Sequence, residues 1–309
     1  MPNLHDIERR INSVTSTKQI TRTMEMVAAA KIRRSSERME NALPWANALS
    51  DMLVSTAKYA PTESEPLLQK HETVKHSVLV VMTSDRGLAG GFNTNVLRAA
   101  EKLMRQKERE GIEVEIIACG KKGIGYFEYR GIKPVLEFKD LSADPTYAEA
   151  TDVAQYIANG YREGGIDEVL IIFNHAKNSA EQRLVTEQIL PVPEDRLADL
   201  LGLKQKEEDI YYDFREHIDD KYNGDIDFEP DEATVMSYLM QMYLTNMVYF
   251  TLIDSAAAEQ GARRTAMKSA TDNANEMVET LTRLYNRERQ GAITTEINEI
   301  VGGAAALEE

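Results

Sequence analysis

The two ends of the chain are long stretches almost free of the residues that interrupt helices. From Asn3 to Tyr59 there is no glycine and the only internal proline is Pro44; from Asp231 to Val301 there is no proline, and glycine occurs only at positions 261 and 291. Both stretches are rich in Ala, Met, Glu, Lys and Arg, which favour helices. They predict two helices of about 80 and 100 Å, the first bent at Pro44, and helices of such length need a partner.

Apolar residues recur in both stretches at the three- and four-residue spacing of one helix face. In the N-terminal stretch the stripe consists of Leu4, Ile7, Ile11, Val14, Ile20, Met24, Val27 and Ile32. In the C-terminal stretch it consists of Val235, Leu239, Met242, Met247, Phe250, Ile253, Ala257, Ala266, Ala270, Met277, Leu281 and Leu284. We expect the two helices to pair as an antiparallel coiled coil, with the longer helix overhanging. The run AAAEQGARRTAMKSA either lets two backbones approach closely or reflects helix propensity alone.

Between these helices the sequence alternates apolar, strand-like runs with amphipathic helices. Strands are expected at 77–83, 114–119, 133–138 and 168–176, helices at 95–110, 121–130 and 147–163, and an edge strand within 180–192. This alternation predicts a mainly parallel, Rossmann-like sheet with right-handed crossovers. The predicted fold class is therefore α/β plus long α-helices. Its parts are an N-terminal coiled-coil helix (1–60), a central Rossmann-like domain (61–200), an acidic loop or insertion (201–230) and a C-terminal coiled-coil helix (231–309).

Charge is distributed unevenly along the chain. The formal net charge is -15, and residues 207–232 hold twelve acids against Arg215 and Lys221, which accounts for -10 of it. This acidic segment is either a mobile, solvated excursion or a dedicated binding tail. The overall charge argues against nucleic-acid binding. The first forty residues, by contrast, carry a net +3, with eight Lys or Arg against five Asp or Glu.

The glycine-rich stretch SDRGLAGGFN follows the first predicted strand, where doubly wound sheets bind phosphate. Its glycines at 87, 90 and 91 match neither G-x-G-x-x-G nor G-x-x-x-x-G-K-[ST], and the later GKKGIG also misses both patterns. We therefore expect a tight turn, with glycines supplying unusual backbone angles or close packing, and no bound cofactor or small-molecule substrate. Asp85 is expected to pair with its neighbour Arg86, and no nucleophile with a matching base lies near them.

The sequence also offers little support for a metal site, a disulfide bond or a membrane-spanning helix. The five histidines show no metal-ligand spacing, and Cys119, the single cysteine, lies in the apolar run VEIIAC as a predicted buried thiol. No stretch approaches the roughly 18 apolar residues of a spanning helix, and MPNLHDIERR lacks the apolar core of a signal peptide. We expect a chain that stays on the side of the membrane where it is made.

Four segments together resemble the gamma subunit of bacterial-type F-type ATP synthase, in collinear order over nearly the whole chain. They are ITRTMEMVAAAKIRRSSERM, SDRGLAGGFN, AAAEQGARRTAMKSATDNANEM and ITTEINEIVGGAAA. The tail is the most specific, with Ile293, Thr294, Glu296, Glu299, Gly303, Ala304 and Ala306 fitting the family's spacing. Two features depart from the family: Ala89 stands where cysteine is frequent, and the acidic segment is longer than usual.

The resemblance implies a central rotor shaft that is not itself an enzyme. In that family the coiled coil stands inside a ring of alternating alpha and beta subunits, and the middle domain lies near the epsilon subunit and the membrane rotor ring of c subunits. Rotation couples proton or sodium flow to ATP synthesis or hydrolysis on the beta subunits, at the cytoplasmic face of the cell membrane. The coupling ion, ring size and working direction depend on other chains.

By the same resemblance, five residues are candidates for partner contact. Arg289, Gln290 and Thr294 match a polar cluster that touches a carboxylate-bearing loop of a beta subunit, and Met24 and Arg263 match positions on the facing helices near that contact. Two other functions remain open from the residues alone. One is a stand-alone nucleotide-dependent protein that uses the glycine-rich loops, and the other is a coiled-coil scaffold that self-associates.

Overall fold

A computed structural model describes residues 4–57, 59, 65–141, 144–178, 180–192 and 227–307. Most of the acidic segment predicted at 201–230 lies outside these residues. The chain divides into two compact units: unit 1 combines residues 1–29 with 263–309, and unit 2 spans 30–262. None of the described helices is long and apolar enough to cross a membrane.

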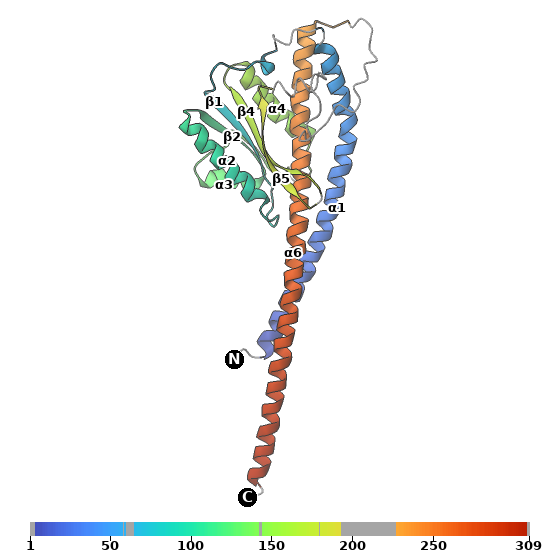
Figure 1. The fold of residues 1–309 in the computed structure, drawn as a ribbon, viewed down its shortest axis with the longest axis vertical. Helices are drawn as coiled ribbons and strands as arrows, with labels where there is room; N and C mark the ends of the chain where they lie inside the picture. Colours follow the sequence, from blue (N-terminus) through green and yellow to red (C-terminus); the bar gives the residue numbers. More distant parts are fainter. Residues whose placement is uncertain are drawn as a thin grey trace. The chain divides into compact units, whose positions relative to one another are not determined.

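The two predicted long helices are confirmed. Helix α1 runs from Leu4 to Ala57 and continues through Pro44, and α6 runs from Glu232 to Leu307 (Figure 1). Each unit contains one part of each long helix.

The five-stranded sheet of unit 2 has the order β3-β2-β1-β4-β5. Its strands are β1 (His76–Met82), β2 (Glu113–Cys119), β3 (Leu136–Phe138), β4 (Glu168–Ala176) and β5 (Gln182–Leu190). The first four are mutually parallel, and β5 pairs antiparallel with β4 at the edge. The predicted mainly parallel sheet with an added edge strand is thus confirmed. Strand β3 is shorter than predicted because Pro134 has no N–H to donate to the ladder.

Helices cover both faces of this sheet (Figure 1). Helices α2 (Phe92–Arg109) and α3 (Lys121–Tyr129) pack on one face, around Leu79, Val81 and Ile116. Helix α4 (Tyr147–Arg162), the 3-10 turn η2 (Pro66–Leu68), and parts of α1 and α6 pack on the other. Strand residues alternate between the two faces, so each face has its own apolar core.

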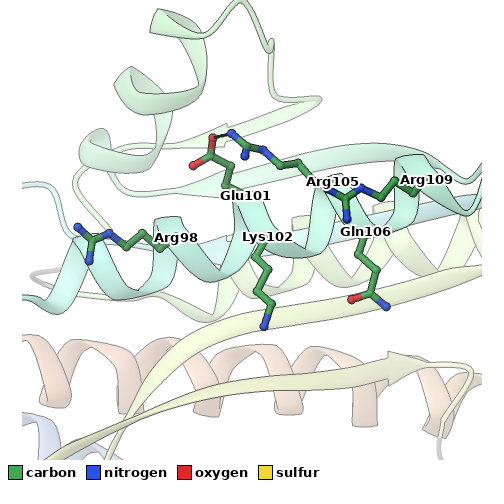
Figure 2. Close-up of a pocket in the computed structure, with 6 residues that line it drawn as sticks. All are labelled: Arg98, Glu101, Lys102, Arg105, Gln106 and Arg109. Atoms are coloured by element: carbon green, nitrogen blue, oxygen red, sulfur yellow. Dashed lines mark hydrogen bonds and ion pairs between the residues drawn. The ribbon is translucent and has the colours of Figure 1, made fainter.

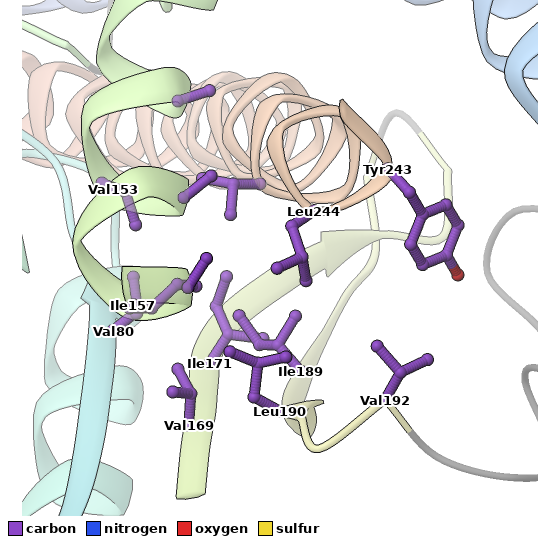
Figure 3. Close-up of a cluster of buried hydrophobic side chains, with 14 of the residues drawn as sticks. Val80, Val153, Ile157, Val169, Ile171, Ile189, Leu190, Val192, Tyr243 and Leu244 are labelled. Atoms are coloured by element: carbon purple, nitrogen blue, oxygen red, sulfur yellow. The ribbon is translucent and has the colours of Figure 1, made fainter. Parts of the chain in front are cut away.

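The second core binds α6 to the sheet. Figure 3 shows Tyr243 and Leu244 of α6 beside side chains from β4, β5 and α4. Branched apolar residues of the nine-residue strands β4 and β5, among them Val169, Ile171 and Ile189, provide the surface on which the helix packs. From Phe250 to Ala262 every residue of α6 is buried, so this part of the helix is covered on all sides.

Unit 1 is a two-helix coiled coil with a narrow interior. On α1 the fully buried positions repeat every seven residues, at Ile7, Thr21 and Ala28, with Val14 half-buried between them. On α6 the buried positions of unit 1 are Arg263, Met267, Thr271 and Ala274. This corrects the predicted apolar stripes, because Ile20, Val27 and Met277 are exposed. Alanine and threonine take up much of the interior beside Ile7 and Met267, and the hydroxyls of Thr21 and Thr271 hydrogen-bond across it at 2.7 Å.

Candidate partner-contact surface

The pairing of the two helices shows how much of α6 extends beyond α1. In an antiparallel pair each step forward on one helix is a step back on the other. Thr21 faces Thr271. Counting back from Thr21 to Leu4, the first residue of α1, covers as many residues as counting forward from Thr271 to Glu288. Leu4 therefore lies opposite Glu288. Residues 289–307 of α6 therefore overhang by roughly 28 Å. Figure 1 shows the red end of α6 continuing past the blue start of α1.

The overhang exposes apolar side chains. Every residue from Arg289 to Val301 is exposed. Ile293, Ile297 and Ile300 have exposed fractions of 48%, 53% and 66%. Large apolar side chains on a solvent-facing helix end are typical of a surface that another chain covers.

Three of the five predicted contact residues lie together on the overhang. Arg289, Gln290 and Thr294 occupy its first two turns, and all are exposed. Thr294 donates its hydroxyl proton to the carbonyl oxygen of Gln290 at 2.9 Å, which satisfies the hydroxyl within the helix. Arg289 and Gln290 are adjacent, and their guanidinium and amide groups can hydrogen-bond to a carboxylate or an amide of another chain.

Met24 and Arg263 lie elsewhere in unit 1. Met24 is half-buried and lies opposite Lys268, whereas Arg263 is buried, with 9% of its surface exposed. Along the continuous α6, Arg263 and Arg289 are about 39 Å apart. The structure therefore does not bring these two residues near the contact predicted around Arg289. It separates the five residues into a set on the overhang and a set on the paired helices.

The glycine-rich loop of unit 2 packs against α6. Ala89 and Phe92 form a small buried cluster with Ala258 and Ala262. Asn174 of β4 donates to the carbonyl oxygen of Phe92 at 3.0 Å. In sheets of this order a nucleotide binds in the crevice beyond the ends of β1 and β4. Here the alanine-rich face of α6 occupies that position.

Of the two predicted roles of the loop glycines, unusual backbone angles or close packing, the structure shows the first at Gly90. Gly90 has a φ of 57° and Leu88 a φ of 65°, so the turn passes twice through the left-handed region. A Cβ added at Gly87 would meet nothing within 4 Å, and one added at Gly91 would lie nearest to the Asn95 side chain, at 3.4 Å. The predicted unusual backbone angle is confirmed at Gly90, and the close packing comes from Ala89 and Phe92.

The start of α3 is capped by the loop that follows β1. The N–H groups of Lys121, Lys122 and Gly123 donate to Asp85 Oδ1 at 3.0 Å, Ser84 O at 3.0 Å and Thr83 Oγ1 at 2.8 Å. These are the amides that a phosphate would use at a helix N-terminus. Asp85 also accepts the Asp140 N–H at 2.9 Å. Its carboxylate therefore joins the ends of β1, β2 and β3, a role that its neighbour Arg86 did not suggest.

Cys119 lies beneath this loop and is 2% exposed, as expected of a core thiol. Burial, with a smaller effect of the nearby Glu149 and Asp85 carboxylates, raises its pKa to about 12. At neutral pH the thiol therefore stays protonated.

Sequence reasoning missed the pair formed by His175 and Asp254. Asp254 of α6 is 1% exposed; it lies 2.7 Å from Nδ1 of His175 and accepts the Ala176 N–H at 3.0 Å. Both partners belong to β4, which makes this buried carboxylate a polar link between α6 and the sheet. The single acid in the run TLIDSAAA stands out in the sequence, but nothing local indicates its partner.

Comparison with known proteins places the whole chain in one family. The model of a family described as ATP synthase matches residues 3–307. The chain is 37% identical to the ATP synthase gamma chain of Streptomyces coelicolor, over 97% of this chain and 94% of that protein. This chain belongs to the ATP synthase gamma-chain family.

Further relatives agree with this assignment. The ATP synthase gamma chain of Cutibacterium acnes is 36% identical over 99% of this chain and 98% of its own length. Among solved structures, a chain of the central stalk and c-ring of Tetrahymena thermophila mitochondrial ATP synthase superposes with a TM-score of 0.56 and 25% identity, covering 81% of this chain and 99% of that one. A chain of the Euglena gracilis mitochondrial enzyme shares the fold, with a TM-score of 0.62 and 20% identity over 98% of this chain and 94% of its own.

Proposed function

We propose that this gamma chain is the central rotor shaft of an F-type ATP synthase. Its rotation couples ion flow through a membrane ring of c subunits to the conformational cycle of catalytic beta subunits. The observation that carries the proposal is the overhang of α6, a single helix end with exposed apolar and basic side chains. Such an end is costly to leave in water and suits the interior of a ring of other subunits.

The polar residues of the overhang suit a contact that forms and breaks repeatedly. Arg289 offers a planar guanidinium that can pair with a carboxylate on a loop of a beta subunit, and Gln290 and Thr294 border it. A partly solvated ion pair is worth only about 1 kcal/mol, so it can guide one orientation without preventing the next. A large dry interface would hold the shaft in one position.

We further propose that catalysis resides in the beta subunits and that this chain binds no nucleotide. Two features of unit 2 support this division. The amides at the start of α3 already donate to Asp85, Ser84 and Thr83, and α6 covers the crevice beyond β1 and β4. A nucleotide would have to displace both.

The sheet domain then serves for attachment rather than for chemistry. We propose that it contacts the epsilon subunit and the c-ring, and that the coiled coil contacts the alpha and beta subunits. The protein would lie at the cytoplasmic face of the cell membrane as a peripheral subunit of the complex.

Assembly with partner subunits tests the proposal. The full chain is produced together with the alpha and beta subunits of its own organism, and ATP hydrolysis and the rotation of a bead fixed to this chain are measured. We expect an active complex in which the bead turns in one direction. Failure to join the alpha and beta subunits into an active ATPase would refute the rotor function.

The same assembly tests the overhang. Arg289→Gln removes the proposed pair, worth about 1 kcal/mol, and should lower the rate of rotation under load about fivefold. Arg283→Gln is the matched control, because Arg283 is also exposed but lies on the part of α6 that α1 accompanies. Equal effects of the two changes would show that the overhang makes no specific contact. Self-association of the isolated chain through its terminal helices would instead favour a scaffold.

A further inference from the structure

Helix α2 carries four basic side chains in a single row. Arg98, Lys102, Arg105 and Arg109 follow one another at spacings of four, three and four residues, and all are exposed. At about 100° per residue they fall within roughly 60° of arc on the helix, over about 17 Å of its length. We call these four residues the basic row. Together with Glu101 and Gln106 they line an open surface hollow of about 520 Å³ (Figure 2).

The opposite side of α2 fixes the basic row in place. Val96, Ala100 and Met104 of α2 are buried in the core against β1, β2 and α3. A helix packed in this way holds the backbone of its outer residues at fixed positions, so less freedom is lost when a partner binds them.

Most of the basic row has no acid to neutralise it. Arg105 pairs with Glu101 at 2.7 Å, and Glu101 also accepts the hydroxyl of Tyr126 at 2.9 Å. Among the residues that the structure describes, Arg98, Lys102 and Arg109 form no ion pair. Figure 2 shows Glu101 and Arg105 meeting on one side of α2, and Lys102 extending on the other.

The remaining basic residue of α2 shows the contrast. Lys107 points away from the row and forms an ion pair with Glu168 at 2.6 Å, with 12% of its side chain exposed. The sequence therefore supplies an acid for the basic side chain that is buried and none for three that face solvent. In a chain with a formal net charge of -15, a row with three cations outside any ion pair of the described residues is a local exception.

We propose that the basic row is a docking site for an acidic segment of a partner protein. The positive charge of the row favours an acidic partner, and the spacing of its side chains favours a segment with regularly repeated carboxylates. Neighbouring positions of the row are about 4.5 to 6 Å apart along the helix axis. Carboxylates on alternate residues of an extended segment repeat at about 6.6 Å, and those one turn apart on a helix at about 5.4 Å.

The row fits other polyanions less well. Binding to a lipid surface usually requires apolar residues beside the cations, and among the described residues of α2 none of the exposed side chains is a large apolar one. The proposal does not depend on the rotor function, since it rests only on the row and its surroundings.

The test measures the binding of a labelled peptide to the full chain by fluorescence anisotropy. The probe is a 16-residue peptide that alternates Glu and Ser, and its counterpart alternates Gln and Ser. We expect the chain to bind the Glu peptide and to lose affinity as NaCl is raised from about 50 to 300 mM, because salt shortens the range of charge interactions. The Gln peptide should not bind.

Two triple variants locate the site. Arg98→Gln, Lys102→Gln and Arg109→Gln together should weaken binding of the Glu peptide at least tenfold. Lys122→Gln, Lys133→Gln and Lys139→Gln remove the same charge from other exposed positions of unit 2 and should change affinity less than twofold. Circular dichroism of both variants checks that the fold is kept.

Several outcomes would overturn the proposal. Equal binding by the two triple variants, or equal binding of the two peptides, would show that the basic row does not recognise carboxylates. Binding to phosphatidylglycerol vesicles through the row, without binding of the Glu peptide, would assign the row to lipid. Peptide binding only after deletion of residues 207–226 would show that the chain's own acidic segment is the occupant.

Discussion

Asp254→Ala is expected to weaken the attachment of α6 to the sheet of unit 2. The carboxylate is 1% exposed and accepts two hydrogen bonds from β4, one from Nδ1 of His175 at 2.7 Å and one from the Ala176 N–H at 3.0 Å. A carboxylate can only accept, so Nδ1 of His175 carries the proton. Alanine leaves both donors without this acceptor.

The expected loss follows from the two bonds. Removing a hydrogen bond to a charged group costs about 1.5–3 kcal/mol, and leaving a buried amide unsatisfied costs about 1–3 kcal/mol. His175 is 20% exposed at its side chain and can partly turn to water, so we expect about 3 kcal/mol in all. Asp254→Asn keeps an acceptor for the Ala176 amide and should cost about 1–2 kcal/mol.

Urea unfolding followed through Trp45 measures this loss. Trp45 is the single tryptophan of the chain and its side chain hydrogen-bonds to Tyr147, so its fluorescence reports on unit 2. With a slope of about 2–3 kcal/mol per M, the midpoint of Asp254→Ala should fall by about 1–1.5 M.

The matched control is Asp152→Ala, which removes an exposed acid from α4. A surface change of this kind should alter stability by less than about 0.5 kcal/mol. If Asp254→Ala lowers the urea midpoint no further than Asp152→Ala does, the proposed link between α6 and β4 is wrong.

Three further predictions use the same preparation. Gly120→Ala should destabilise unit 2 by about 3 kcal/mol or more, because Gly120 has a φ of 96° and an added Cβ would strike the Thr83 carbonyl oxygen. Gly125→Ala, where a Cβ meets open space within α3, should be neutral or stabilising in the same titration, and similar losses at both sites would contradict this explanation. Cys119, whose pKa burial raises to about 12, should resist a thiol reagent at pH 8 until urea unfolds the chain; a native rate within tenfold of the unfolded rate would count against its burial. Burial alone would raise the pKa of Asp167, but hydrogen bonds from His71 and from the Lys75 and His76 amides lower it below 3.8. The stability that these bonds provide is present above that pH and is lost as pH falls through the lower, folded-state pKa. Asp167→Asn should therefore cost about 1 kcal/mol at pH 7 and progressively less below about pH 3, and a urea-midpoint difference that stayed constant between these pH values would refute the assignment.

Sequence patterns located the elements of this fold well. Long stretches without glycine or proline predicted α1 and α6 to within a few residues, and the alternation of apolar runs predicted the strands of the parallel sheet. These features are local, because helix propensity and strand periodicity depend on neighbouring residues.

The interior of the coiled coil was predicted less well. Ile20 and Val27 extend the apolar stripe in the sequence but are exposed, whereas Thr21 is buried against Thr271. The sequence of one helix shows which residues are apolar, but it does not show which face the second helix covers. When many helix positions are apolar, the partner's small residues decide the face, and this information is long-range.

The candidate contact surface shows the same limit. Resemblance supplied Arg289, Gln290 and Thr294, and the structure adds that they begin the overhang. The separation of Arg263 from Arg289 needed only the helical rise and could have been worked out from the sequence. The capping of α3 by Asp85 and the pairing of Asp254 with His175 join distant segments, which no local pattern indicates.

The burial of α6 from Phe250 to Ala262 has a mechanical consequence. A helix that touches its surroundings along one stripe can turn about its own axis by exchanging one set of contacts for another. Here the β1–α2 loop meets Ala258 and Ala262, β4 holds Asp254, and the apolar core holds Leu252, so any axial turn must break contacts in several directions together. Torque applied to the sheet of unit 2 is therefore transmitted to residues 250–262 of α6, and the sheet and this part of the helix rotate together.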